Sequence, residues 1–251
     1  MITATTHLQY FRSSLIPIPH AMFSRTGGYS DGVHSSLNFS FHVNDTDQNV
    51  CKNRELAQKI LNLAYLASAH QVHLDRIKIV EEKTTMEYDG YDALITNCKG
   101  MGLLVQQADC QAVLLHDPET QTIGAIHCGW RGSVCEIIPR TIERMQTAFG
   151  VVPHHIRAVI SPSLGPCCAQ FIHYKTELPA WMHAYQVRRG YFDFWAISRI
   201  QLVESGVPFQ QIETTGICTR CTPSFFSHRR DVASGRKFGG RGGSVIGLPS
   251  V

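Results

Sequence analysis

The sequence lacks any apolar run that could cross a lipid bilayer, and it carries little net charge. No stretch approaches the roughly 18 consecutive apolar residues that a membrane helix needs. The formal net charge of +3 gives no reason to expect nucleic acid as a partner. The N-terminal stretch has no basic segment followed by an apolar one, so we expect no export signal. We therefore expect a cytoplasmic protein that binds neither membranes nor nucleic acids.

Several sequence signatures are also missing. We find no internal repeat and no low-complexity linker, and the glycine-rich segments do not match the GxxxxGK[ST] pattern of a phosphate-binding loop. Multicopper oxidases need paired His-x-His motifs, and the chain contains none. These absences argue against a P-loop nucleotidase and against a copper oxidase. The sequence indicates no particular oligomeric state.

Cysteine and histidine are abundant. The chain has nine cysteines and 13 histidines in an otherwise ordinary globular composition, with 43% hydrophobic and 17% charged residues. In a reducing compartment, thiols act as metal ligands, nucleophiles or small buried groups rather than as disulfides. Thiolate and neutral imidazole are the ligands that zinc prefers. The composition therefore raises the expectation of a transition-metal site.

Short β-branched and aliphatic runs alternate with fewer helical segments. Strands are predicted at Arg76–Val80, Tyr91–Thr96, Gly102–Gln107, Gln111–His116, Thr122–His127 and Ile156–Ser161. The turn-forming segment 117–120 predicts a hairpin. Helices are predicted around 46–61 with Asp45 or Thr46 as the cap, around 134–149 with Pro139 in the first turn, and from 193 to Gly206 with a stripe of Trp195, Ala196, Ile200 and Val203. Consecutive strands joined by hairpins favour a single α+β domain, a mixed β-sandwich with flanking helices, over a Rossmann-type sheet.

Glycines cluster near the C-terminus, in the segment 238–244 that begins at Phe238. We expect this segment to form a mobile loop before a last short strand.

The segment 106–111 places Asp109 and Cys110 between two apolar runs. A cysteine at the end of a buried strand, beside an acidic residue, is well placed for chemistry. Neighbouring side chains on a strand point to opposite faces, so we expect these two to act on different atoms. The alternative is equally open: Cys110 is a small core residue and Asp109 caps a turn.

About one hairpin later, the segment 127–132 carries His127 and Arg131. Glycines on both sides of Trp130-Arg131 indicate a tight backbone that exposes a guanidinium suited to phosphate or carboxylate. A surface loop with Trp130 packed in the core remains the alternative.

Upstream, His70 and His73 form a His-x-x-His pair, which is a weak metal signal alone. His73, Cys110 and His127 nevertheless all fall at strand edges of one β region, where strand ends meet. Two imidazoles and one thiolate leave zinc an open fourth position, which is typical of catalytic sites. Zinc at such a site lowers the pKa of a bound water to about 7.

The other cysteines are less informative. Cys218 and Cys221 form a lone CxxC, and a structural zinc needs a second pair. The adjacent Cys167 and Cys168 have the wrong spacing for a zinc ribbon, so we expect them to shape a turn that lines a pocket.

Taken together, ten segments resemble the YfiH-like family, also labelled as laccase-domain or multicopper polyphenol oxidase proteins. They occur in the family order from about residue 20 to 248. The segments are Phe23–Gly28, Ser36–Phe39, His42-Val43, Asn53-Arg54, Gln71–His73, Ala108–Cys110, His127–Gly132, Gly165–Cys168, Cys218–Cys221 and Phe225–Asp231.

The resemblance implies a single α+β sandwich domain over residues 1–251. It implies one zinc ion per chain, bound by His73, Cys110 and His127. It also implies small-molecule purine nucleosides as substrates: phosphorolysis of adenosine, inosine or methylthioadenosine, with inorganic phosphate as co-substrate, and hydrolytic deamination of adenosine.

Further residues take candidate roles within this resemblance. The pocket-lining motif positions correspond to Arg25, Asn38, Gln71 and Arg131. Arg131 and Arg25 are candidate cations for phosphate, and the two amides can hydrogen-bond ribose or base. His42 and Asp109 are candidates to protonate the departing base, although Asp109 can instead orient a ligand histidine.

Three other functions stay open. The chain can be an amide hydrolase with Cys110 as nucleophile and His127 as base. A related possibility is an enzyme that edits peptidoglycan precursors. A zinc-stabilised binding module without turnover is the third, and it predicts a closed site with four ligands.

Overall fold

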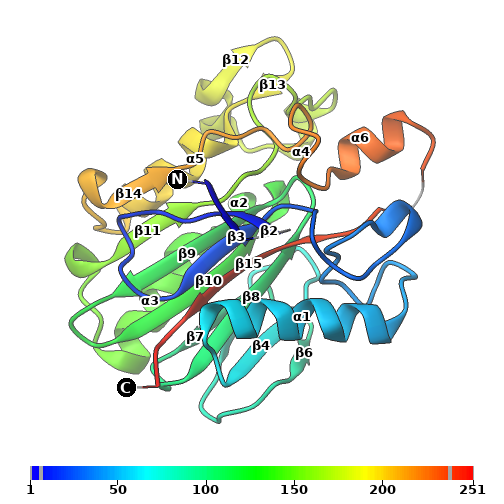
Figure 1. The fold of residues 1–251 in the computed structure, drawn as a ribbon. Helices are drawn as coiled ribbons and strands as arrows, with labels where there is room; N and C mark the ends of the chain where they lie inside the picture. Colours follow the sequence, from blue (N-terminus) through cyan, green and yellow to red (C-terminus); the bar gives the residue numbers. More distant parts are fainter. Residues whose placement is uncertain (1, 6–7, 237–238, 251) are drawn as a thin grey trace.

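Two β-sheets lie face to face, and helices cover their outer faces (Figure 1). The structure is a computed structural model that describes residues 2–5, 8–236 and 239–250. Residues 1 and 251, the ends of the expected domain, lie outside the described residues. No helix among the described residues is both long and apolar enough to cross a membrane.

The first sheet has seven strands in the order β1 (Ile2–Thr5), β2 (Leu8–Phe11), β3 (His20–Phe23), β15 (Gly242–Gly247), β8 (Met101–Gln107), β4 (Tyr65–His70) and β6 (Glu87–Asp89). The second has six strands in the order β14 (Ile212–Thr214), β11 (Arg157–Ile160), β9 (Gln111–Asp117), β10 (Thr122–Cys128), β7 (Ala93–Thr96) and β5 (Ile77–Ile79). Both sheets are mixed: β4 runs parallel to β6 and β8, β5 to β7 and β11 to β14, and the other pairs are antiparallel.

The helices are α1 (Asp47–Leu61), α2 (Trp130–Val134), α3 (Ile137–Phe149), α4 (Tyr174–Glu177), α5 (Phe194–Glu204) and α6 (His228–Ala233). Short 3-10 helices span Gly32–His34, Pro153–His155, Ala180–Tyr185 and Phe209–Gln211. A separate hairpin pairs β12 (Gln186–Arg188) with β13 (Tyr191–Phe192).

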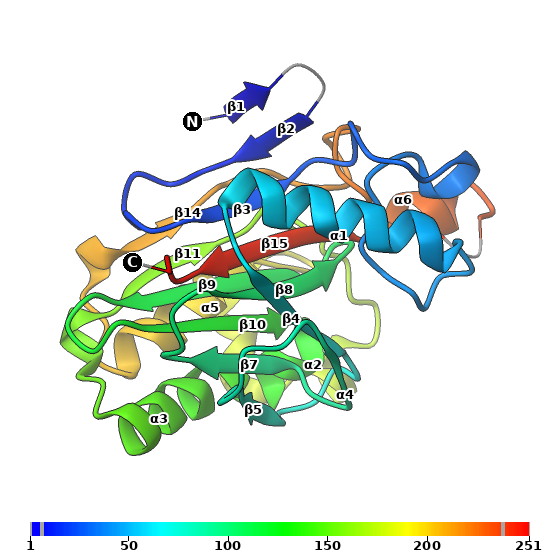
Figure 2. The ribbon, with the colours of Figure 1, turned by 60° about the horizontal axis from the view of Figure 1, so that its bottom comes forward.

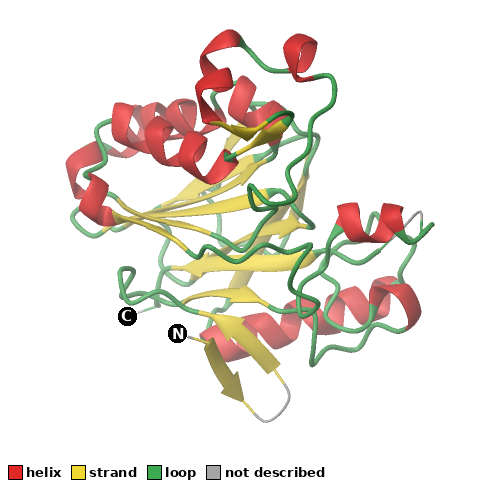
Figure 3. Ribbon diagram, turned by 90° about the horizontal axis from the view of Figure 1, so that it is seen from above, coloured by secondary structure: helices red, strands yellow, loops and turns green. Residues whose placement is uncertain are grey.

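The inner strands bury side chains on both faces, because each sheet is covered by the other sheet on one face and by helices on the other. In β7, Ala93 and Ile95 pack toward α3, whereas Leu94 packs between the two sheets. Helix α1 covers the other face of the seven-stranded sheet, where Ala57 and Leu61 pack against strand residues. Figure 3 shows the resulting order of layers, helix, sheet, sheet, helix. This arrangement confirms the predicted α+β sandwich with flanking helices.

The six predicted strands and three predicted helices are present, with ends shifted by a few residues. Thr46 caps α1 by accepting a hydrogen bond from the Asn49 N–H, and Pro139 lies in the first turn of α3. The hairpin at 117–120 joins β9 to β10. Asp193 caps α5 as predicted.

The predicted apolar stripe of α5 is wrong by a rotation of the helix. Its buried residues are Phe194, Ile197, Ser198, Gln201 and Leu202. The predicted Trp195, Ala196, Ile200 and Val203 are only half-buried. Phe194 and Ile197 face an aromatic cluster built from residues between Ala169 and Phe192, which periodicity within the helix does not reveal.

The predicted glycine loop ends earlier than expected: residues 239–241 precede the last strand, as predicted, but residues 242–244 do not belong to a loop. Phe238, the first residue of the predicted loop, lies outside the described residues. Residues 242–244 belong to β15, a fully buried strand between β3 and β8, which Figure 2 shows crossing the centre of its sheet. A Cβ on Gly243 would lie 2.7 Å from the Phe39 ring. The absence of a side chain at Gly243 therefore lets the Phe39 ring pack against the strand backbone.

Candidate metal and substrate site

His73, Cys110 and His127 converge at one end of the sandwich. His73 lies in the loop after β4, Cys110 in the turn between β8 and β9, and His127 near the end of β10. One ligand atom from each lies within 4.8 Å of the other two. Residues separated by 37 and 17 positions in the chain therefore form one cluster, which we call the His-Cys-His cluster.

A glycine allows these three side chains to approach. Gly129 is the N-cap of α2, and a Cβ on it would lie 2.9 Å from Cys110 Sγ and 3.3 Å from the His73 ring. The His73 and His127 rings meet edge to face, with centroids 4.7 Å apart. Any side chain at position 129 would displace the sulfur.

Asp92 holds both histidines in place. Its Oδ1 accepts hydrogen bonds from His127 Nδ1 and from the His73 backbone N–H, both at 2.8 Å. Its Oδ2 accepts from the N–H groups of Val72 and Leu74. The Asp92 carboxylate thus fixes the loop that carries His73 and leaves His127 Nε2 to face the cluster. This is the positioning role that the sequence assigned to Asp109; Asp92 itself was missed, although an acid directly before the buried run of β7 was a signal.

The cluster is strongly polarised in the absence of a metal. Burial alone would raise the pKa of the Cys110 thiol, but the charge and hydrogen bonds of His127 and His73 lower it to about 6. Burial alone would lower the pKa of His127, but the Cys110 thiolate and the Asp92 carboxylate raise it to about 9. A thiolate beside an imidazolium is the favoured state between these two values.

The donor set fits a metal ion. Two imidazoles and a thiolate, with the second nitrogen of His127 bonded to a carboxylate, are the chemistry of a catalytic zinc site. The same set occurs in blue-copper sites, where an axial methionine completes the coordination. No methionine is found among the residues that line the two cavities next to the cluster.

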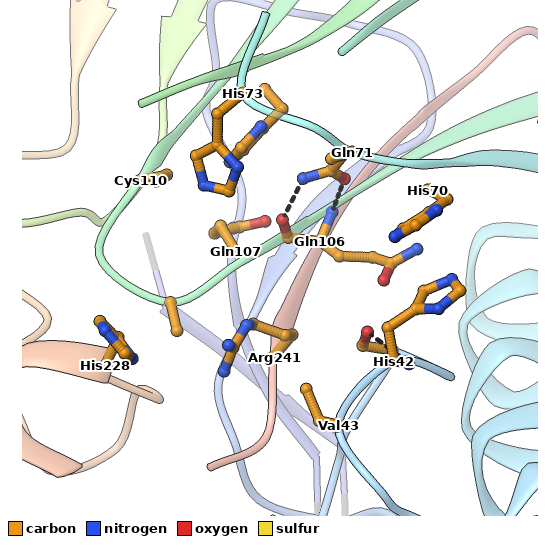
Figure 4. A pocket seen from close by; sticks show the side chains of 13 residues that line it. His42, Val43, His70, Gln71, His73, Gln106, Gln107, Cys110, His228 and Arg241 are labelled. Atoms are coloured by element: carbon orange, nitrogen blue, oxygen red, sulfur yellow. Dashed lines mark hydrogen bonds between the residues drawn. The ribbon is translucent and has the colours of Figure 1, made fainter. Parts of the chain in front are cut away.

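The first cavity has a volume of about 350 Å³, within the range of small-molecule sites. Figure 4 shows its side chains, with His73 and Cys110 at one end and His42 and His70 at the other. Its lining comprises Ser40, His42, Val43, His70, Gln71, His73, Gln106, Gln107, Ala108, Cys110, His127, His228 and Arg241.

Arg241 brings a half-buried cation to this cavity, and the sequence did not reveal it. Its guanidinium donates to the carbonyls of Gly239 and Gly240, and its backbone N–H donates to Asn38 Oδ1. Burial lowers the pKa of Arg241, and the Cys110 thiolate opposes that shift. Asn38, predicted to line the pocket, is instead fully buried and lines neither cavity. Its amide anchors the backbone of Ser40 and Arg241.

The opposite wall is formed by a stacked histidine pair. The rings of His42 and His70 lie 3.9 Å apart, and His42 Nε2 lies 2.6 Å from Glu87 Oε1. Gln71 lines the same cavity, but its amide exchanges two hydrogen bonds with the backbone of Gln106. Gln71 therefore ties the His73 loop to β8 and has little capacity left for a substrate.

A second cavity of about 300 Å³ adjoins the cluster on the other side. It shares His73, Cys110 and His228 with the first cavity, and Arg131 and Trp130 line it. Arg131 is exposed and lies over the Trp130 ring at 4.3 Å, while Trp130 also contacts Phe171. The guanidinium is accessible, as predicted. The alternative of a surface loop with Trp130 packed in the core does not describe the segment, because Trp130 is half-buried and begins helix α2. His228 was not recognised as a site residue.

Two predicted residues lie away from the chemistry. Asp109 points away from Cys110, as expected, with both carboxylate oxygens occupied by Thr219 Oγ1 and the Arg229 N–H, each at 2.6 Å. Arg25 lines neither cavity; it stacks on Phe226 and donates to the Ser35 carbonyl. Both residues organise loops around the site.

The remaining cysteines are closer together than the sequence indicated. Cys167, Cys168, Cys218 and Cys221 place their four sulfurs within 4.8 Å of one another. The spacing argument against a metal-binding group was therefore wrong, because residues 50 positions apart in the chain supply the missing second pair.

The comparisons with known proteins agree with one another. The family model described as multi-copper polyphenol oxidoreductase laccase matches residues 19–248. Purine nucleoside phosphorylase YlmD of Bacillus subtilis is 33% identical over 227 residues, covering 83% of this chain and 82% of that protein. A purine nucleoside phosphorylase of Deinococcus radiodurans is 32% identical, covering 96% of this chain and 94% of the relative.

Solved structures show the same fold. The hypothetical protein YfiH of Bacillus licheniformis superposes with a TM-score of 0.87 at 29% identity, covering 97% of each chain. YlmD of Geobacillus stearothermophilus also gives 0.87, at 26% identity and 98% coverage of each chain. With the family model spanning nearly the whole sequence and the fold shared end to end, the chain belongs to the YfiH-like, laccase-domain family.

Proposed function

We propose that this protein is a zinc-dependent purine nucleoside enzyme. Its reactions would be phosphorolysis of adenosine, inosine and methylthioadenosine, and hydrolytic deamination of adenosine. The names of its relatives from Bacillus subtilis and Deinococcus radiodurans, both purine nucleoside phosphorylases, support phosphorolysis.

One observation carries the proposal: the His-Cys-His cluster faces a cavity that also contains Arg241. Three ligands at the edge of a cavity leave the fourth metal position accessible to a substrate. A zinc ion bound there would polarise an oxygen of phosphate or water. The half-buried Arg241 guanidinium supplies a second positive group in the same space.

Phosphorolysis breaks the bond between C1′ of ribose and N9 of the purine and forms a bond between C1′ and a phosphate oxygen. The base departs with the bonding electrons and needs one proton. Arg241 would bind and orient phosphate, in place of Arg25, which lies outside the cavity. Arg131, in the second cavity, would contact the far end of the nucleoside.

Of the two candidates for the proton donor, the geometry favours His42. It lines the first cavity, and Glu87 holds its Nε2, so the imidazole is oriented. Asp109 has both oxygens bonded to Thr219 and Arg229 and lines only the second cavity. In deamination, water adds at C6 of adenine and ammonia leaves, and a cation-polarised water fits the same cluster.

The experiment is a product assay with metal-analysed protein. Adenosine or inosine is incubated with and without phosphate, and ribose 1-phosphate, free base and inosine are quantified. We expect base and ribose 1-phosphate in equal amounts, dependent on phosphate, lost after chelation and restored by zinc. Absence of both ribose 1-phosphate and inosine from zinc-loaded protein would refute the proposal.

The polarised Cys110–His127 pair favours one second candidate, an amide hydrolase. Cys110, His127 and Asp92 have the arrangement of a nucleophile, its base and an orienting carboxylate. The two candidates differ in their response to metal. Chelation would activate or spare the hydrolase and abolish the nucleoside enzyme, whereas alkylation of metal-free protein would inactivate the hydrolase irreversibly.

A further inference from the structure

A second group of potential ligands lies on two loops, the first of which also carries Leu164 and Ala169 of the second cavity. Cys167 and Cys168 follow β11, and Cys218 and Cys221 follow β14. We call them the four-cysteine cluster. None of these residues belongs to the proposed nucleoside site.

The spacing of the sulfurs matches a single metal ion. Cys221 Sγ lies 3.5 Å from Cys168 Sγ and 3.7 Å from Cys167 Sγ. Four thiolates at the zinc–sulfur distance of 2.3 Å in a tetrahedron are separated by about 3.8 Å. Disulfide sulfurs lie about 2.05 Å apart. In an iron–sulfur cluster, the iron and sulfide atoms lie between the cysteine sulfurs and hold them farther apart than the distances found here.

Backbone groups around the cluster resemble those of a metal knuckle. The N–H of Gly165 points at Cys218 Sγ at 3.3 Å, and the N–H of Thr222 closes a turn onto the Cys218 carbonyl. Backbone N–H groups directed at a sulfur stabilise a thiolate over a thiol. Cys168 and Cys218 are buried, whereas Cys167 and Cys221 are exposed, so an ion can enter from solvent.

We propose that the four-cysteine cluster binds one zinc ion, distinct from the ion at the His-Cys-His cluster. Four thiolates in a tetrahedron are characteristic of closed, structural zinc sites. The thiols release protons and zinc takes their place, with no change of oxidation state.

Such an ion would fasten the loop that packs on Asp109, beside the proposed nucleoside site. Thr219, between two of the cysteines, donates its hydroxyl hydrogen bond to Asp109, the neighbour of Cys110. Arg230 donates to the Thr219 carbonyl, and Arg229 donates its N–H to Asp109. A cross-link between 167–168 and 218–221 therefore holds the segment that carries His228 into both cavities.

The first test is the metal and thiol content of the intact protein. Purified wild-type protein, supplied with zinc and freed of excess, should contain two zinc equivalents per chain and no iron or sulfide. Denaturation with chelator under anaerobic conditions should release nine reactive thiols, the full cysteine count. Cobalt replacing zinc should give the intense visible bands of a tetrahedral tetrathiolate, which a site with two imidazoles does not produce.

The second test separates the two sites. Cys221→Ala should lose one zinc equivalent and the tetrathiolate cobalt bands, and its thermal midpoint should fall by several degrees. Cys221→His should keep two equivalents, because three cysteines and a histidine form a common zinc set. Cys51→Ala, a matched control at an exposed cysteine on α1, should change nothing.

Distinct outcomes would overturn this proposal and the proposed function. The second site is excluded if wild-type protein holds one zinc equivalent, if Cys110→Ala removes that equivalent, and if Cys221→Ala leaves the zinc content unchanged. A disulfide among the four cysteines, or stoichiometric iron in the cobalt-free protein, excludes it as well. Failure of nucleoside turnover with two bound zinc ions would refute only the proposed function.

Discussion

Asp92 is the residue on which the geometry of the His-Cys-His cluster depends most. Replacing it with asparagine puts an N–H₂ group where a carboxylate oxygen now accepts hydrogen bonds. We expect Asp92→Asn to weaken zinc binding by about 10–100-fold, because His127 loses its orientation and basicity. Competition with a chromogenic chelator measures this affinity. Asp47→Asn, at an exposed acid in the first turn of α1, is the control.

Arg241 is predicted to act on phosphate rather than on the nucleoside. We expect Arg241→Gln to raise the KM for phosphate by about 10–100-fold, since a charge-assisted hydrogen bond contributes about 1.5–3 kcal/mol. Steady-state kinetics with each substrate varied in turn tests this. An unchanged KM for phosphate would show that phosphate does not bind at Arg241. Arg140→Gln, on the exposed face of α3, serves as the control.

That His73, Cys110 and His127 converge could be predicted from the sequence, because each lies next to a recognisable strand. His228 and Arg241 could not, since they come from the C-terminal segment and reach the cavity only through tertiary packing. The four-cysteine cluster was missed for the same reason. Its two pairs lie about 50 residues apart, and the adjacent Cys167 and Cys168 do not have the spacing of a second CxxC pair.

Strand β15 shows what glycine does inside this sandwich. We expect Gly243→Ala to destabilise the protein by about 1–3 kcal/mol, because the added methyl group would lie 2.7 Å from the buried Phe39 ring. Gly242→Ala, one residue earlier, would meet only ordinary contacts, the nearest at 3.5 Å. Urea unfolding of the two variants gives the comparison. Equal stabilities would contradict the packing role.

Elements with a clear hydrophobic pattern were predictable from the sequence, whereas elements whose structure depends on pairing with other strands were not. The run at 122–128 and the helix at 137–149 carry enough apolar residues to be recognised locally. Strand β4 was missed because it contains small residues, and β15 because its glycines suggested a loop. Both are strands because they pair with a neighbouring strand on each side in the seven-stranded sheet, which no local pattern reveals.

At the scale of the molecule, Glu87 links helix α1 to the seven-stranded sheet. Its carboxylate contacts Arg54 from α1, Ser68 from β4 and His42 from the cavity wall. Burial alone would raise the pKa of Glu87, but Arg54 and the hydrogen bonds lower it to about 2. This carboxylate contributes stability above its unfolded pKa, and that contribution is lost as pH falls toward 2.

We expect Glu87→Gln to lower the free energy of unfolding at neutral pH by about 1–2 kcal/mol, less than the pKa shift implies because the carboxylate is partly exposed. The difference from wild type should be constant above about pH 5 and should shrink as pH falls below about 4.5. Urea unfolding across this range measures it. A difference that grows on acidification would contradict the ion pair; Asp89→Asn, at a highly exposed acid, is the control.

The account depends most on the claim that Cys110 binds the metal that turnover requires. The direct measurement is bound zinc and ribose 1-phosphate formation in wild type, Cys110→Ala and the control Cys135→Ala. We expect Cys110→Ala to lose one zinc equivalent and to form no ribose 1-phosphate above background, with the control unchanged. A Cys110→Ala protein with the zinc content and rate of wild type would contradict the account.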